Sequence, residues 1–280
     1  KGFSIMPVDN VLKLYSKTIE SKFLHYGFWN NPEKIKLEDF SLNEIKNAQK
    51  RYIQNLTSYI PNEVKLILDV GCGIGGNALF LINQGYIVET LSPDDYQKMV
   101  IEDTFNGSVP FFHTKFESFN SNKQYDLILQ SESACYIKIN KGFKKAFEII
   151  KPGGYLLASD YFVYNDDNSK SPHLKASHNL DNYLSSAEKN GFEVISKFDQ
   201  TEHTMPTLDY AKYFLDRFIN PILEYGKYSA SKNFPKLFYL AKKSIANKIE
   251  DKKRQLELID SIEFKKYRKY MIYLFKKKHV

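Results

Sequence analysis

The chain has 280 residues, of which 42% are hydrophobic and 26% charged, with a formal net charge of +7. This composition is typical of a globular soluble protein, and the length suits one α/β domain with elaborations. No apolar run reaches the ~18 residues that cross a bilayer, and the start lacks a signal pattern, so we expect a cytoplasmic protein without a membrane span. The two cysteines, Cys72 and Cys135, lack metal-ligand spacing, so no metal site is expected.

Residues 1–60 precede the first predicted strand and are expected to form helices. Apolar residues recur at helical spacing up to Leu24, and the aromatic segment HYGFW follows at 25–29. A second amphipathic helix is predicted from Ser41 to Ile60. Ser41 is its expected N-cap, with Glu44 three residues later as in a capping box.

The stretch KLILDVGCGIGGNALFLINQGYIVETLSP at 65–93 predicts a strand, a glycine turn, a helix and a second strand. Glycines at such a turn let the backbone approach a ligand and deliver it to a helix N-terminus. Asp69 ends the first strand, where an anion would repel a pyrophosphate but suits a cationic ligand with an α-amino group. S-adenosylmethionine, which carries both a sulfonium and an ammonium, has this chemistry.

This stretch resembles motif I of the class I S-adenosylmethionine-dependent methyltransferases. Its end, VETLSP, resembles the branch that includes tocopherol, sterol and cyclopropane-type methyltransferases and polyketide-tailoring enzymes. The resemblance implies an α/β fold with a doubly wound, seven-stranded, mostly parallel, Rossmann-like sheet, and S-adenosylmethionine as cofactor. Thr90, with Glu89 just before it, matches the position that holds the ribose, and either could serve. The implied cofactor contacts in this stretch are Asp69, Gly71, Cys72, Gly73, Gly75, Thr90 and Leu91.

The HYGFW segment resembles an aromatic element found ahead of motif I in the same branch. By this resemblance Tyr26 is a neighbour of cofactor or substrate, and Tyr15 matches an upstream tyrosine that reaches the methionine moiety. A buried aromatic staple that fastens the N-terminal helices to the sheet is the alternative for Phe28 and Trp29.

The chain beyond motif I continues the alternation of helices and strands. Gln97 resembles the glutamine of the family's L-S-P-x-Q element, and Phe116, after a third strand at 109–113, is expected to pack on the adenine. A fourth strand is predicted at 125–130. Because carboxyl ends of parallel strands face the ligand, Gln130, Ser131 and Glu132 are candidates for the floor of the reaction centre. Glu132 could instead be a helix cap or a surface acid.

A helix is predicted at 141–150, and IKPGGYLL then resembles the family's turn into a fifth strand at 155–160. A helix at 180–190 and a sixth strand at 191–195 follow. A helical run of ~55 residues, at 206–261, then separates this strand from an antiparallel seventh strand at 270–275; it is too long for a loop. We therefore expect N-terminal helices over the site (1–60), a cofactor-binding core (61–203 and 263–280) and a helical substrate cap (204–262).

Methyl transfer from a sulfonium is an in-line displacement that needs alignment and, for a hydroxyl or ammonium acceptor, removal of a proton. His203 is the first candidate for the base, because the D-x-T element at 199–201 resembles the family's entrance to this insertion. His25 and Glu132 follow. A packing or solvent-facing role is the alternative for each histidine.

The sequence favours methylation of an oxygen or nitrogen of a small molecule, such as a natural product, which the net charge of +7 would allow to be anionic. Alternatives are a C-methyltransferase on an isoprenoid or lipid-like substrate and a non-methylating, cofactor-binding cyclase. An RNA methyltransferase is disfavoured, since SESACY after the fourth strand is unlike the turn of base methyltransferases and the basic residues gather at 242–278. We expect no nucleic-acid partner. Acceptor atom, substrate and oligomeric state stay open.

Overall fold

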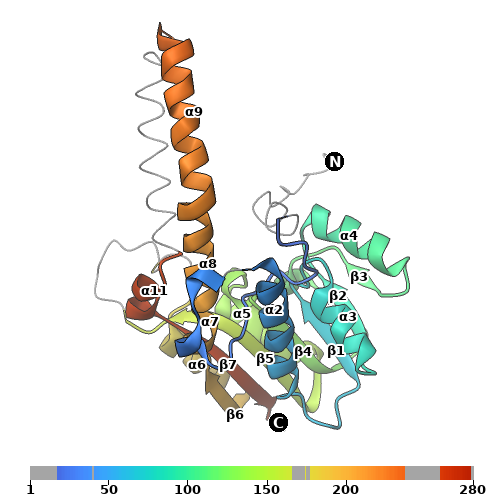
Figure 1. Ribbon diagram of the computed structural model, residues 1–280. Coiled ribbons are helices and arrows are strands. Elements are labelled where there is room, and N and C mark those ends of the chain that lie inside the picture. Colours follow the sequence, from blue (N-terminus) through green and yellow to red (C-terminus); the bar gives the residue numbers. More distant parts are fainter. Residues whose placement is uncertain (1–17, 40, 166–173, 175–176, 237–258, 279–280) are drawn as a thin grey trace.

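The computed structural model describes residues 18–39, 41–165, 174, 177–236 and 259–278. Its centre is a seven-stranded sheet in the order β3-β2-β1-β4-β5-β7-β6 (Figure 1). All strand pairs are parallel except those of β7, which runs antiparallel to β5 and β6. The predicted doubly wound sheet with an antiparallel seventh strand is thus confirmed. The strands are β1 Leu66–Val70, β2 Ile87–Leu91, β3 Phe111–Phe112, β4 Tyr125–Ser131, β5 Ile150–Val163, β6 Phe192–Asp199 and β7 Arg268–Lys277.

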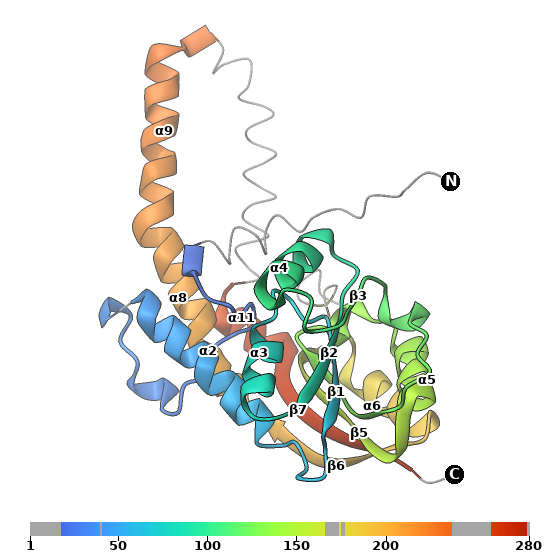
Figure 2. The same ribbon diagram turned by 90° about the vertical axis from the view of Figure 1, so that its right-hand side faces the viewer.

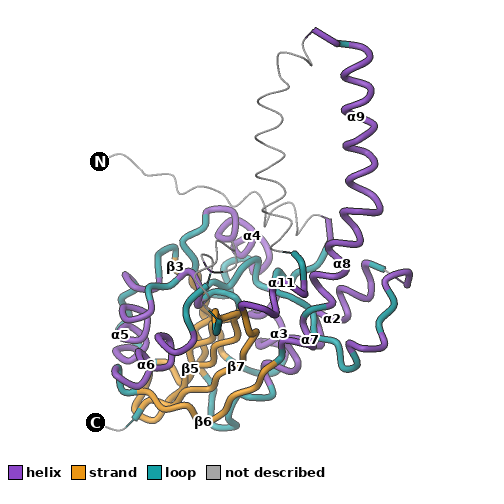
Figure 3. Tube along the Cα trace, turned by 90° about the vertical axis from the view of Figure 1, so that its left-hand side faces the viewer, coloured by secondary structure: helices purple, strands orange, loops and turns teal. Residues whose placement is uncertain are grey.

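Helices cover both faces of the sheet, because consecutive strand residues point to opposite sides. Ile67 packs in a core with side chains of α2 and α3, whereas its neighbour Leu68 packs in a second core with side chains of α5 and α6. Figures 2 and 3 show α2 and α3 on one side of the strands and α5 and α6 on the other. The helices are α2 Leu42–Thr57, α3 Gly76–Asn83, α4 Asp95–Phe105, α5 Ile139–Ile149 and α6 Leu180–Lys189. Short 3₁₀ turns lie at Pro32–Lys34, Leu37–Asp39, Phe116–Ser118 and Ala134–Tyr136.

The N-terminal prediction was right for the second helix and wrong for the end of the first. Ser41 caps α2 by accepting a hydrogen bond from the Glu44 amide (3.1 Å). The helix expected up to Leu24 has ended by Glu20, and the chain beyond it is irregular. Long-range contacts hold this segment against α2, since the Gln49 side chain donates to the carbonyls of Phe23 (3.1 Å) and His25 (2.9 Å).

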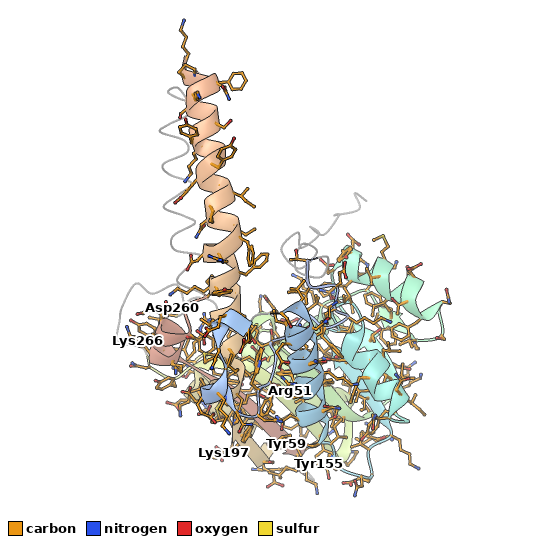
Figure 4. All side chains as sticks on the ribbon, in the orientation of Figure 1. Arg51, Tyr59, Tyr155, Lys197, Asp260 and Lys266 are labelled. Carbon is orange, nitrogen blue, oxygen red and sulfur yellow. The ribbon has the colours of Figure 1, made fainter. Side chains whose placement is uncertain are left out.

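The helical run predicted at 206–261 is divided into several pieces. Within it lie α8 Pro206–Phe214, a π-helical stretch Leu215–Ile219 and α9 Asn220–Asn233, while 237–258 lie outside the described residues. The short helix α7 Thr201–Thr204 precedes the predicted range, and α11 Ser261–Tyr267 begins at its end. Figure 1 shows α9 projecting away from the sheet. At its base Lys212 and Asp260 form an ion pair (2.7 Å), with Asp260 and Lys266 labelled in Figure 4. No helix in the described ranges is long and apolar enough to cross a membrane.

Candidate active site

A cavity of about 610 Å³ opens where β1, β2 and β4 end. Its walls come from the segment before α2, from the glycine turn, and from the chain after each of these strands. This is the place where parallel α/β sheets bind ligands, since the loops at the carboxyl ends diverge there. The residues that form its walls are 22–25, 70–74, 76–77, 91–94, 97, 115–118, 131–133, 136–138, 141 and 161.

The glycine turn takes left-handed backbone conformations, with φ of 72° at Gly71, 56° at Gly73 and 87° at Gly75. A Cβ on Gly71 would lie 2.4 Å from the Ser133 Cβ, and Ser133 itself donates to the Val70 carbonyl (2.5 Å). Glycine is therefore required here for close packing of the turn against the loop after β4, in addition to its freedom at positive φ. Gly75 is the N-cap residue of α3. Of the predicted contacts in this turn, Gly71, Cys72 and Gly73 line the cavity.

Buried oxygen atoms without partners lie at the carboxyl end of β1 and in the first turn of α4, the helix that follows β2. Among the described residues neither Asp69 Oδ2 nor Gln97 Oε1 has a hydrogen-bond partner. Asp69 is 1% exposed, and burial raises the pKa of its carboxyl to about 7. Burial raises the pKa of the cavity-lining Cys72 thiol, and the charge of the nearby Asp69 adds to this. Buried acceptors of this kind suit a ligand that brings hydrogen-bond donors or a positive charge.

The two residues predicted to hold a ribose are engaged elsewhere in this structure. Thr90 donates its hydroxyl to the Pro110 carbonyl (2.9 Å), and the Glu89 carboxylate binds Lys123 (2.5 Å) and Tyr125 (2.6 Å). Neither lines the cavity, whereas Ser92 and Asp94, a few residues further on, do. Ribose binding by Thr90 stays a prediction.

Apolar side chains form another part of the cavity wall. Phe116, which was expected to pack on the adenine, and Leu91, an expected cofactor contact, are buried and both line the cavity. Gln97 also lines it, and its backbone amide donates a hydrogen bond (2.8 Å) to the Asp94 carboxylate that caps α4.

Glu132 follows β4 with a left-handed backbone (φ 52°) and lines the cavity. Its Oε1 accepts hydrogen bonds from the Tyr26 amide (2.6 Å) and the Tyr270 hydroxyl (2.6 Å). Burial raises the pKa of the carboxyl to about 8, and the nearby charge of Asp160 adds to this, while the two hydrogen bonds oppose it. Glu132 is therefore a carboxyl group that titrates near neutral pH beside a cavity.

The two candidate histidines are placed differently. His25 lines the cavity, its Nδ1 lies 2.8 Å from the Tyr26 carbonyl oxygen, and burial lowers its pKa to about 4. His203 stacks on Phe28 (ring centroids 4.5 Å) with its Nδ1 2.8 Å from the Trp29 carbonyl oxygen, and it is not among the cavity-lining residues.

Three further predicted site residues are not among the described residues that line the cavity. Tyr26 is held beside the cavity by Glu132, and its ring centroid lies 6.3 Å from that of the cavity-lining Tyr161. Gln130 is buried and faces a small pocket near α5. Tyr15 lies outside the described residues.

Sequence reasoning missed Lys22, Phe23 and Leu24, which line the cavity, and Tyr270, which binds Glu132 from the last strand. No pattern signalled the first three, because their position depends on contacts with α2 and the glycine turn. Tyr270 lies 138 residues from Glu132 in the chain. Only the strand order, which places β7 next to β5, brings them together.

The strand order, the glycine turn between β1 and α3, and the cavity at the carboxyl ends define a class I S-adenosylmethionine-dependent methyltransferase. Residues 45–202, more than half of the chain, match the family model described as "Methyltransferase domain". The chain belongs to this family and is an S-adenosylmethionine-dependent methyltransferase of the small-molecule type.

Individual relatives are distant. The methyltransferase GfsG of Streptomyces halstedii is 23% identical over 203 residues, which cover 66% of this chain and 70% of that protein. The crystal structure of the cyclase SpnF superposes with a TM-score of 0.67 at 16% identity, over 100% of both chains. Geranyl diphosphate C-methyltransferase from Streptomyces coelicolor, crystallised with S-adenosylhomocysteine, gives a TM-score of 0.64 at 14% identity, over 90% of this chain and 87% of that one. The two structures establish the fold alone.

The residues of this chain fit the family's cofactor, S-adenosylmethionine. Gln97 Oε1 is a buried acceptor on the cavity wall, and Asp69 Oδ2 is a second one directly before the lining residue Val70, although Asp69 itself is not among the lining residues. Both would suit donors of the cofactor. The apolar side chains of Leu91 and Phe116 offer a surface for a flat base.

Proposed function

We propose that this chain transfers a methyl group from S-adenosylmethionine to an oxygen or nitrogen of a small molecule, such as a natural product or another metabolite. The observation that carries the proposal is Glu132, a carboxyl group with a pKa raised to about 8 at the wall of the cavity. A hydroxyl or ammonium acceptor must lose a proton during methylation, and a base whose pKa lies near the working pH serves this step best.

In this proposal the cofactor is held by the residues of the glycine turn and of the chain after β2. Asp69 would pair with its ammonium, Gln97 would accept from its donors, and Phe116 would pack on its adenine. The bound cofactor supplies a methyl group on a positively charged sulfur. The remaining predicted contacts, Tyr15, Tyr26, Gly71, Cys72, Gly73, Gly75, Thr90, Leu91 and Gln130, are part of the same proposal.

Glu132 then acts on the acceptor. The lone pair of the acceptor forms a bond to the methyl carbon as the carbon–sulfur bond breaks, and Glu132 takes the proton that the acceptor loses. Oε1 already accepts two hydrogen bonds, and no hydrogen bond from the described residues reaches Oε2. Oε2 is therefore the atom that would receive the proton. We assign this role to Glu132 rather than to His203, whose ring is engaged with Phe28 and Trp29.

The substrate is proposed to be anionic. Lys22, Lys115, Lys138 and Lys141 all line the cavity, and none of them forms an ion pair within the described part of the chain. Ammonium groups without carboxylate partners favour a ligand that carries a phosphate or carboxylate.

A second candidate, methylation of carbon in an isoprenoid or lipid-like substrate, is favoured by the tyrosine rings beside Glu132. The ring centroids of Tyr26, Tyr161 and Tyr270 lie 5.6 to 6.3 Å apart. Aromatic faces stabilise cations, and adding a methyl group to an alkene creates a carbocation. The same surroundings could serve a cyclase that binds the cofactor without using its methyl group.

The test is incubation with methyl-labelled S-adenosylmethionine and fractions of small metabolites, with RNA as a separate acceptor. We expect label on oxygen or nitrogen of a small molecule. Glu132→Gln should lower turnover by about 10²- to 10⁴-fold while S-adenosylhomocysteine still binds. The control is Glu63→Gln, since Glu63 is exposed and accepts from Tyr155 (2.5 Å) near the start of β5.

Other labelling results would support a different function for the chain. Label on carbon would support the second candidate, and an altered carbon skeleton without label would support a cyclase. Label in RNA alone would contradict a small-molecule substrate. Full turnover in Glu132→Gln would remove the base from the proposal.

A further inference from the structure

Behind Glu132, a row of polar side chains crosses the buried interior. Gln200 Nε2 lies 2.8 Å from Ser159 Oγ, which lies 2.7 Å from the Tyr52 hydroxyl. The Tyr52 hydroxyl lies 3.0 Å from that of Tyr270, which donates to Glu132 (2.6 Å). Gln200, Ser159, Tyr52 and Tyr270 are all 0% exposed. They belong to α2, β5, β7 and the junction of β6 with α7, so residues far apart in the chain form this one row of hydrogen bonds.

When Glu132 is ionised, the direction of every hydrogen bond in this row is fixed by its two ends. An ionised carboxylate only accepts and an amide nitrogen only donates, whereas each hydroxyl has one proton to give. Tyr270 must give its proton to Glu132, so it accepts from Tyr52. Tyr52 in turn accepts from Ser159, and Ser159 accepts from Gln200. Every donor in the row therefore points toward Glu132.

An aligned row of donors stabilises the ionised carboxylate more than the last bond alone, because successive hydrogen bonds polarise one another. Burial and the charge of Asp160 act in the opposite direction and raise the pKa of Glu132. With these hydroxyls the pKa of the carboxyl is about 8, so part of it is ionised near neutral pH; without them the pKa would be higher and the ionised fraction that can accept a proton from a substrate would be smaller. The other titratable or charged groups of the elements that surround Glu132 are His25, Tyr26, Cys135, Asp160, Tyr161 and Arg268.

The hydroxyl groups of Tyr52 and Tyr270 contribute hydrogen bonds that packing of their rings does not require. The rings of Tyr52 and Tyr270 meet edge to face with centroids 6.1 Å apart, an arrangement that two phenylalanines would also fill. Burying two phenol hydroxyls would cost stability unless they were bonded. Their bonds lead to Glu132 at one end and to Gln200 at the other.

We propose that Tyr270 and Tyr52 are positioning residues. They hold Glu132 in place and set how readily it accepts a proton, through this row of hydrogen bonds whose donors all point toward Glu132. The proposal rests on the proposed function, in which Glu132 takes the proton of the acceptor. It predicts that removing either hydroxyl, with the ring kept, changes the protonation of Glu132 from within the core. Within the described part of the chain the Tyr270 hydroxyl has no bond to another cavity-lining side chain, whereas the Tyr52 hydroxyl also lies 3.4 Å from Oγ of the cavity-lining Ser131.

The test is the pKa of Glu132 measured by NMR in protein carrying ¹³C-labelled glutamate, with the Glu132 signal assigned by its absence in Glu132→Gln. Loss of a hydrogen bond to a charged group corresponds to about one pKa unit or somewhat more. Tyr270→Phe should therefore raise the pKa of Glu132 from about 8 by roughly this amount. Tyr52→Phe should raise it less, because Tyr270 still donates. In both variants the acid limb of the pH–rate profile should move in the same direction.

The matched control is Tyr155→Phe, which removes the phenol hydroxyl that donates to Glu63 and should leave the Glu132 signal in place. Tyr155, labelled in Figure 4, belongs to the same strand as Ser159 but lies toward its start. Should Tyr270→Phe fail to fold, Tyr52→Phe carries the test. A Glu132 pKa that is unchanged in the folded tyrosine variants overturns the proposal. This result is distinguishable from failure of the proposed function, which would show as full turnover in Glu132→Gln.

Discussion

Replacing Asp69 by asparagine tests how this chain recognises its cofactor. Asp69 is 1% exposed, its Oδ2 has no partner among the described residues, and burial raises the pKa of its carboxyl to about 7. A buried carboxyl of this kind is costly to ionise alone, but an ammonium brought by the cofactor would offset the cost. Binding of the cofactor should therefore be coupled to loss of a proton from Asp69.

The size and the sign of the effect follow from this coupling. A hydrogen bond to a charged group contributes about 1.5–3 kcal/mol, so Asp69→Asn should weaken S-adenosylhomocysteine binding by about 10- to 150-fold at pH 8. Below a pH of about 7, free wild-type protein holds the proton on Asp69, and its affinity should fall by up to roughly tenfold per pH unit. Asparagine cannot ionise, so the variant should lack this slope.

The assay is titration calorimetry with S-adenosylhomocysteine between pH 6 and 8. Asp103→Asn serves as the control, since Asp103 is an exposed aspartate on α4. If Asp69→Asn bound the ligand as tightly as wild type at pH 8, or kept the same dependence on pH, the assigned role of Asp69 would be wrong.

Other measurements test other parts of the molecule. A Cβ added at Gly85 (φ 91°) would meet no atom within 4 Å, so Gly85→Ala should lower the free energy of unfolding in urea by only about 1–2 kcal/mol. Gly71→Ala should lower it more, because its Cβ would collide with Ser133, and equal losses would contradict this packing. Phe116→Ala should weaken S-adenosylhomocysteine binding by roughly 5- to 150-fold through loss of stacking, and unchanged affinity would place the base elsewhere. From pH 6.5 to about 8 the folded protein, with the pKa of Asp69 and of Glu132 raised, binds more protons than the unfolded chain. The free energy of unfolding of the cofactor-free protein should therefore decrease across this window, and an increase would contradict these shifts.

The parts of the fold that depend on local pattern were predictable from sequence. The apolar run before Asp69, the glycines after it and Gly85 after the next helix place β1, the turn and α3 within one or two residues. The antiparallel last strand was also predicted, and it extends beyond the expected range to Arg268–Lys277. Strand ends were less accurate, since β3 comprises only Phe111–Phe112 where five residues were expected. The edge position of β3 limits the pairing that defines it.

The site was predictable where it depends on the order of residues in one loop, and less so where separate segments meet. Gly71, Cys72, Gly73, Leu91 and Phe116 were expected near the cofactor and all line the cavity. Which of several ionisable residues faces the cavity is decided by tertiary contacts, so sequence alone ranked His203 above His25 and Glu132. The helical insertion shows the same limit. Helical spacing predicts that helices form there but does not say where they pack, and the described residues of 204–262 are absent from the cavity wall. Their role as a substrate cap stays a prediction.

A crystal structure of the chain with S-adenosylhomocysteine would show whether this cavity holds the cofactor next to Glu132. We expect the ligand to occupy the cavity of about 610 Å³, with its amino-acid end at the glycine turn and its sulfur facing Glu132. Ligand density outside this cavity, or a sulfur that points to the wall opposite Glu132, would contradict this expectation.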